Sequence, residues 1–280
     1  IGNYVLDGAM NGAANNTVVG YAAMTDLTTG DGNTAFGHRA LHQVSTGADN
    51  IGIGRSAGFA ATDSSSLVLI GKSAGVTIND TGADGTVAIG LSALKLLTSG
   101  EGNIAIGYAA MDGSGGATVL GSSDNVFMGY DSGGGTWTTA VSTHNVAIGN
   151  FSMDDAMNGA LHNTAVGNAS LGGVTEGDSN VGIGSKAGLA ITTGSFNTLV
   201  GYQCGDTLIL TTHNTAMGSD ALSGSSLVDQ CVVIGSQAAT GAVTADADGT
   251  VAIGYAALQS LTSGAGNLAI GYSALSSQLT

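Results

Sequence analysis

Histidines are the residues of this chain best suited to acid-base or metal chemistry, and three of the five share one position of a repeat. His144, His162 and His213 each stand five residues before a glycine that follows a large apolar residue, whereas His38 and His42 stand elsewhere. An imidazole can act as a general base or bind a metal. Glycine fills the same position in several other repeats, which is typical of an exposed corner. We therefore expect corner residues without a catalytic or metal-binding role.

No other group of residues indicates catalysis or a cofactor. The chain has no nucleophile motif, phosphate-binding loop or Cys/His metal cluster that stands out from its 48 glycines. Cys204 and Cys231 occupy different repeat positions, so we expect two buried thiols and no disulfide. The sequence thus predicts a protein that is not an enzyme and has no cofactor and no metal. Calcium at acidic corners such as Asp31 or Asp178 remains an alternative.

The charge of the chain excludes several partners. Twenty acidic residues against five basic ones give a net charge of −15. Nucleic acids and anionic membranes are bound through Lys and Arg, so neither is an expected partner. No run of 18 apolar residues occurs, so we expect no membrane insertion in this segment.

The positions of these residues follow from a repeat that covers the whole chain. A glycine preceded by a large apolar residue recurs mostly every 17 residues; these ladder glycines are Gly2, Gly20, Gly37, Gly54, Gly71, Gly90, Gly107, Gly129, Gly149, Gly167, Gly184, Gly201, Gly218, Gly235, Gly254 and Gly271. Such a period is the signature of a solenoid, and 17 residues are too few for a helical hairpin. The sequence predicts an all-β fold, one continuous parallel β-solenoid over residues 1–280 with about 16 turns of about 17 residues.

A longer period lies above the short one. Six successive ladder glycines, from Gly20 to Gly107, match those from Gly184 to Gly271 with an offset of 164 residues, or nine turns. This indicates a duplicated block, with repeat units at about 3–166 and 167–280. The chain begins and ends within the repeat pattern, so we expect it to be part of a longer repeat chain.

Two apolar columns precede the ladder glycine. The residue directly before it is always large, and the residue two before it is mostly Ala or Gly. Adjacent residues of a strand point to opposite faces, so both faces of this strand are apolar. We expect the large column to fill the interior and the small column, which includes Ala105, to face further copies of the chain. The sequence therefore predicts a homo-oligomer.

Asparagine dominates the position four residues before the ladder glycine. Stacked amides can form hydrogen bonds along a solenoid, so we expect a structural ladder. Its members are Asn16, Asn33, Asn50, Asn103, Asn125, Asn145, Asn163, Asn180, Asn197, Asn214 and Asn267.

The segments NTAFGHRAL, NIAIGYAAM, NTAVGNASL and NLAIGYSAL carry a resemblance to known repeats. They resemble the head repeats of trimeric autotransporter adhesins and the Asn-Thr-Ala-Ile-Gly arrays of bacteriophage tail fibres, over nearly the whole chain. The resemblance implies a parallel β-roll, three chains about one axis and attachment to surfaces. Neither the stalk and membrane anchor of the adhesins nor the self-cleaving end of the phage fibres is present in these residues, so the choice between the two remains open.

These observations together predict a mechanical function. We expect a fibre shaft or adhesin head of a virion appendage or cell-surface filament, located outside the cell or on a virion, which binds copies of itself, as a trimer, and a surface receptor or glycan. The alternative is an ice-binding β-solenoid, because a column of threonines stands three before the ladder glycine: Thr17, Thr34, Thr164, Thr198 and Thr215. A hexapeptide acyltransferase is disfavoured because the short motif occurs once per turn instead of three times.

Two surfaces are candidates for recognition. Tyrosines follow six ladder glycines directly and suit a subunit seam or carbohydrate stacking. The long turns at 112–124 and 130–143 are the largest departures from the regular repeat, and insertions often carry binding on rigid scaffolds. We expect a contact patch there, with Asp131 and Trp137 on the surface.

Overall fold

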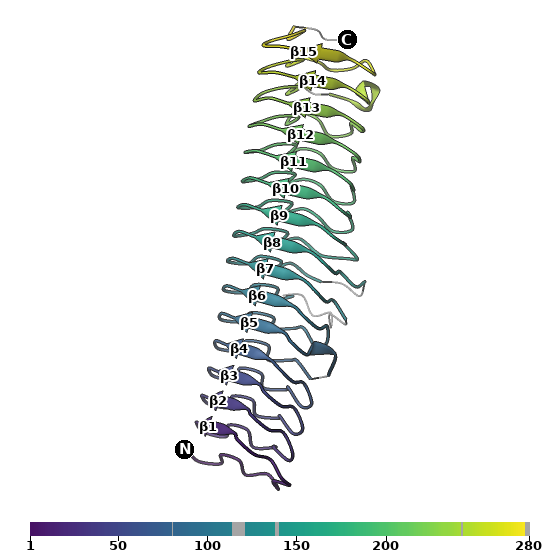
Figure 1. Ribbon diagram of the computed structural model, residues 1–280. Helices are drawn as coiled ribbons and strands as arrows, with labels where there is room; N and C mark the ends of the chain where they lie inside the picture. The colour runs from purple at the N-terminus through teal and green to yellow at the C-terminus, as the bar shows by residue number, and fades with distance from the viewer. Residues whose placement is uncertain (80, 114–120, 138–139, 242, 278–280) are drawn as a thin grey trace. The chain divides into compact units, whose positions relative to one another are not determined.

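The chain folds as a parallel β-solenoid with no α-helix among its described residues (Figure 1). The computed structural model describes residues 1–79, 81–113, 121–137, 140–241 and 243–277. Contacts divide it into two compact units, Ile1–His144 and Asn145–Thr280. The predicted all-β solenoid with one short strand per repeat is confirmed, although the repeat at Gly2 contains no strand.

The first unit contains seven strands of three residues, each directly before a ladder glycine. Each strand pairs in parallel with the next one along the chain, residue for residue, as Thr17 with Thr34 and Val18 with Ala35. A short 3₁₀ helix, η1 (Thr81–Ala83), lies in the long turn before β5. The strands are β1 (Thr17–Val19), β2 (Thr34–Phe36), β3 (Ile51–Ile53), β4 (Val68–Ile70), β5 (Val87–Ile89), β6 (Ile104–Ile106) and β7 (Val126–Met128).

The second unit repeats this arrangement. Its strands also pair in parallel and in sequence order, and η2 (Ala245–Ala247) occupies the turn that corresponds to η1. The strands are β8 (Val146–Ile148), β9 (Thr164–Val166), β10 (Val181–Ile183), β11 (Thr198–Val200), β12 (Thr215–Met217), β13 (Val232–Ile234), β14 (Val251–Ile253) and β15 (Leu268–Ile270).

The ladder glycines are required by the close stacking of successive turns. Gly20 has a φ of 149°, and a Cβ atom on it would lie 2.2 Å from the carbonyl oxygen of Gly37. Gly37 stands in the same relation to Gly54. No other residue fits this position because the obstacle is backbone, which cannot move aside.

The interior of each turn is filled from three sides. The middle residue of the strand points inward, and it meets the residues three, four and seven positions after the ladder glycine. In the turn of Gly90 these are Ala88, Ala93, Leu94 and Leu97, all at most 2% exposed. The buried asparagine closes the remaining side, where the chain turns into the strand.

Candidate interaction surfaces

The column of strand residues that points outward is not the one predicted from the sequence. The middle residues, which form the small column, are buried within the single chain: Ala105 is fully buried and Ala35 is 1% exposed. The large column lies outside, where Phe36 is 57% and Met217 48% exposed. The prediction that the small column faces a partner and the large column fills the interior is therefore wrong. A 17-residue turn encloses too narrow a space for large residues on both of its walls.

The sizes of facing residues explain this arrangement. Where the middle strand residue is Ala, the residue four after the ladder glycine is usually Leu or Met, as for Ala88 and Leu94. Where the strand residue is large, the facing residue is Gly: a Cβ on Gly75 would lie 2.8 Å from Leu69, and one on Gly133 would lie within 2.5 Å of the Phe127 ring. Most turns therefore place one long side chain between their walls, as close packing demands. The turn of Gly54 has glycine at both positions, and leucines of the neighbouring turns fill its interior: a Cβ on Gly58 would lie 2.6 Å from Leu69 and 2.8 Å from Leu41.

We call the first and third residues of the strands the outer face. Both columns contain only apolar residues and threonine, with no charged side chain from β1 to β7 or from β8 to β15. At about 4.8 Å per rung, the seven strands of the first unit extend this face over about 30 Å. A continuous apolar surface of this length is uncommon on a soluble monomer and is typical of an interaction site.

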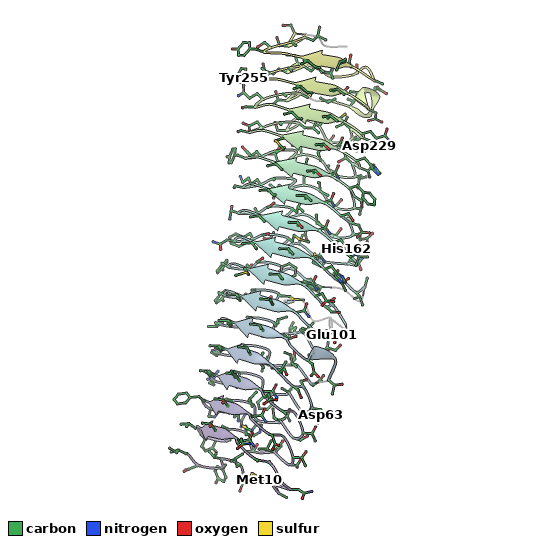
Figure 2. All side chains as sticks on the ribbon, in the orientation of Figure 1. Met10, Asp63, Glu101, His162, Asp229 and Tyr255 are labelled. Atoms are coloured by element: carbon green, nitrogen blue, oxygen red, sulfur yellow. The ribbon has the colours of Figure 1, made fainter. Side chains whose placement is uncertain are left out.

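Tyrosines border the outer face along one edge. Tyr108 and Tyr130 stack with ring centroids 5.2 Å apart, and Tyr255 and Tyr272 stack at 5.3 Å. In the second unit, Tyr255 lies at the opposite edge from His162 and Asp229, which mark the corner side (Figure 2). Tyr108, Tyr130 and Tyr255 are about half exposed and Tyr272 is 80% exposed, so their polar edges remain available to a neighbouring molecule.

The asparagines form the hydrogen-bonded ladder in the interior. In the second unit the side-chain Nδ2 of Asn180 donates to Oδ1 of Asn163 at 3.1 Å and to the corner carbonyl of Gly194 at 2.8 Å. Asn197 and Asn214 repeat this pattern. Oδ1 of Asn163, Asn180 and Asn197 also accepts the backbone N–H of the next asparagine, and Oδ1 of Asn214 accepts the N–H of Cys231. All eleven except Asn16 and Asn267 are fully buried. The amides therefore serve the backbone and are not available to a ligand.

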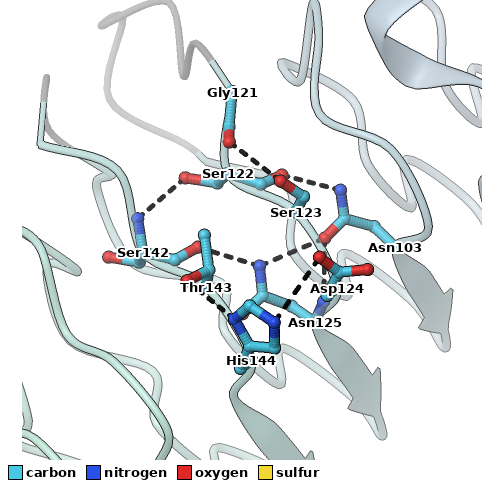
Figure 3. A network of polar contacts seen from close by, with 9 residues as sticks. All are labelled: Asn103, Gly121, Ser122, Ser123, Asp124, Asn125, Ser142, Thr143 and His144. Atoms are coloured by element: carbon cyan, nitrogen blue, oxygen red, sulfur yellow. Dashed lines mark hydrogen bonds and ion pairs between the residues drawn. The ribbon is translucent and has the colours of Figure 1, made fainter.

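The same network occurs in the first unit. Nδ2 of Asn103 donates to the carbonyl of Ser122 at 2.7 Å, and Oδ1 of Asn103 accepts from both nitrogens of Asn125 (Figure 3). Beside it, Nε2 of His144 lies 3.7 Å from Oδ2 of Asp124, with both side chains about half exposed (Figure 3).

The remaining side chains that could take part in acid-base, metal or thiol chemistry lie at the corners or in the interior. The corner histidines His144, His162 and His213 are exposed and have φ near 60°, and His213 stacks on Phe196 with centroids 5.0 Å apart. Within the described part of the chain, no group of three His, Cys, Asp or Glu residues could hold a metal ion. Cys204 and Cys231 are free and buried; burial raises the pKa of Cys204 to about 12 and also raises that of Cys231.

The expected contact patch at the long turns needs a correction. Trp137 is 1% exposed, because its ring packs edge-on against Phe127 and its Nε1 donates to the carbonyl of Gly133 at 2.7 Å. The prediction that Trp137 lies on the surface is wrong, since the larger turn folds inward to fill the space over Gly133. Asp131 is partly exposed. Residues 114–120 and 138–139 of these turns lie outside the described residues.

A different surface was missed by the sequence reasoning. Phe196, Leu210 and Leu227 are each more than half exposed at the corners before β11, β12 and β13. Comparing the two copies of the 164-residue block would have found them, because the first copy has Gly32, Thr46 and Asp63 at the same positions.

No helix among the described residues is long and apolar enough to cross a membrane. Comparison with protein-family models, with curated proteins and with solved structures finds no match for this chain.

Proposed function

We propose that the protein is a structural fibre shaft or adhesin head of a virion appendage or cell-surface filament, without catalysis. In this proposal the chain acts outside the cell or on a virion, associates with copies of itself as a homotrimer, and contacts a surface receptor or glycan. The uncharged, apolar outer face carries the proposal. The resemblance to adhesin and tail-fibre repeats supports the number of chains and the role in attachment.

Copies of the same chain are the most economical covering of the outer face. The face repeats at the spacing of the strands, so an identical strand array offers a matching series of side chains. The large residues outside, such as Phe36 and Ile53, are of the kind that fill the core of permanent interfaces. The tyrosines at the edge of the face suit the polar rim of such an interface.

The molar mass in solution tests the proposal. Light scattering on the size-separated protein is expected to give three times the chain mass of 27.1 kDa at micromolar concentration. A mass of 27.1 kDa that persists at tenfold higher concentration would refute self-association, and twice the chain mass would refute the trimer.

An ice-binding solenoid is the second candidate, and one observation favours it. The threonine column lies on the same side of the strand as the large column, which was expected to fill the interior. Instead, Thr17, Thr198 and Thr215 lie exposed on the outer face, in register with the neighbouring rungs. Thermal hysteresis of the purified protein distinguishes the two: a fibre has none, and an ice-binding protein separates the freezing and melting points.

A further inference from the structure

A compact apolar surface lies on the corner side of the second unit, away from the strand residues of the outer face. We call Phe196, Ile209, Leu210 and Leu227 the corner patch; they are 54%, 39%, 56% and 51% exposed. They come from three successive turns that lead into β11, β12 and β13. Asp229, at the corner side of the unit, marks their place (Figure 2).

The corner patch contains a hollow with a charged wall. A cavity of about 270 Å³ is lined by Leu210, Thr211, Leu227 and Asp229. The backbone N–H of Thr212 donates to Oδ1 of Asp229, which holds the carboxylate beside the two leucines. The site therefore offers two aliphatic walls and one fixed negative charge.

The duplicated block shows that the fold does not require this apolar surface. Ile209, Leu210 and Leu227 correspond in the first copy to Ser45, Thr46 and Asp63. There, Oδ1 of Asp63 accepts hydrogen bonds from the Ser45 hydroxyl at 3.1 Å and the Thr46 hydroxyl at 2.8 Å.

The backbone hydrogen bond that joins this corner to the preceding turn is present in both copies. The N–H of Thr28 donates to the carbonyl of Ser45 at 2.9 Å, and the N–H of Thr192 donates to the carbonyl of Ile209 at 3.0 Å. One copy thus forms this corner with a hydrogen-bonded polar group, and the other with exposed aliphatic residues that folding alone would not select.

We propose that the corner patch binds a peptide segment of a partner protein in which an aliphatic side chain stands next to a Lys or Arg. The aliphatic side chain enters the hollow between Leu210 and Leu227, and the cation pairs with Asp229. This inference goes beyond the proposed self-association, because it uses a different side of the chain and a different partner.

Charge distinguishes this occupant from a second copy of the chain. Each chain has a net charge of −15, and Asp248 lies directly behind Asp229, its Oδ1 accepting the N–H of Asp229 at 2.8 Å. A second copy bound at the corner patch would bury only a few side chains, and this small apolar contact would have to overcome the repulsion between two negatively charged chains. The long outer face buries more apolar surface and can overcome the same repulsion more easily. The same field attracts a cationic segment and raises its rate of encounter.

The test uses three acetylated dipeptide amides on the full chain: Leu-Lys, Leu-Glu and Ser-Lys. Methyl NMR of leucine-labelled protein should show saturable shifts at Leu210 and Leu227 with Leu-Lys. One nearby charge pair in water contributes about 1 kcal/mol, so the Leu-Glu peptide should bind about fivefold or more weakly. Ser-Lys should give no saturable shift at these methyl groups.

Two variants complete the test. The triple change I209S/L210T/L227D installs the residues of the first copy on the same backbone, so it should fold and lose Leu-Lys binding; L227D alone replaces it if the triple variant does not fold. Asp229→Asn keeps an acceptor for the N–H of Thr212 and removes the charge, so the preference for Leu-Lys over Leu-Glu should nearly vanish.

Several results would overturn the proposal. These are equal binding of the Leu-Lys and Leu-Glu peptides to the unmodified chain, no saturable shift at Leu210 or Leu227 with any peptide, Leu-Lys binding that survives in the folded triple variant or in L227D, or a preference for Leu-Lys that is unchanged in Asp229→Asn. Shifts at these methyl groups that depend on protein concentration without peptide would assign the corner patch to a second copy instead.

Discussion

The match between facing side chains in the interior predicts that two harmful substitutions compensate each other. Leu69 fills the turn of Gly71, and Gly75 faces it with no side chain. Leu69→Ala leaves a cavity and should cost about 3 kcal/mol. Gly75→Leu places a side chain whose Cβ alone lies 2.8 Å from Leu69 and from Ile78; crowding and a left-handed φ of 55° should together cost about 3 kcal/mol.

The double variant should recover much of this loss. Independent effects would add to about 6 kcal/mol, whereas a leucine at position 75 can occupy the volume that Leu69 vacates, as Leu94 does opposite Ala88 one turn further on. The φ of 55° does not forbid this, since Leu94 has a φ of 51°. We expect the double variant to be destabilised by about 3 kcal/mol, which is a coupling of about 3 kcal/mol.

Urea unfolding followed by fluorescence measures these free energies. Trp137 is the single tryptophan, it is buried, and it lies in the same unit as Leu69. Circular dichroism should give the same midpoints if unfolding is two-state, and protein concentration must be held constant because the proposed self-association would make stability depend on it. Leu69→Ala combined with Met24→Ala, a buried residue three turns away, is the control and should be additive. A Leu69/Gly75 pair that is additive within about 0.5 kcal/mol would refute the size-matching account.

Three further predictions concern the ladder, the thiols and salt. Asn103→Ala should lower the free energy of unfolding by about 3 kcal/mol in urea titrations, because it leaves several buried groups without partners, whereas the exposed Asn79→Ala should change it by less than about 0.5 kcal/mol. Burial raises the pKa of Cys204 to about 12, so the folded thiol stays protonated while the unfolded one ionises near pH 9. Stability should fall above that pH by at most about 1.4 kcal/mol per unit for this thiol, and Cys204→Ala should reduce the slope in denaturation between pH 8 and 10, with the remainder coming from Cys231, whose pKa burial also raises. Because each chain has a net charge of −15, added NaCl should screen repulsion and tighten the oligomer, and weakening in concentration-dependent light scattering would contradict an apolar interface.

The sequence was sufficient to predict where the strands and corners lie. Every strand ends directly before a ladder glycine, and the residue five before that glycine often has a positive φ, as Asp49 and Phe196 do. Period alone places these elements, because each turn must return to the same register for its glycine to stack on the next.

Inside and outside could not be read from hydrophobicity, because both columns of the strand are apolar. The sign that would have separated them is the size relation between distant positions. Leu69 with Gly75, Phe127 with Gly133 and Leu199 with Gly205 are three occasions where a large strand residue coincides with a glycine six residues later. Such an inverse relation between the sizes of two side chains is needed only where both side chains fill the same interior space.

Trp137 shows the same limit for an insertion. A long polar turn with one aromatic residue is typical of an exposed loop, yet this ring fills the gap that Gly133 leaves over Phe127. The local composition of the turn gives no sign of that gap, which is created by the bulky ring of Phe127 at a position where most turns have Ala.

The central claim is that the outer face, and not the small column, joins copies of the chain. Sedimentation velocity on the paired variants Phe36→Glu and Ala35→Glu tests it most directly, because the two residues are adjacent and point to opposite faces. Phe36→Glu should yield a folded chain with the mass of a monomer, since the charge disrupts only the interface. Ala35→Glu should unfold, since it buries a charge inside the chain. A Phe36→Glu variant that sediments as the same oligomer as the wild type would contradict the account.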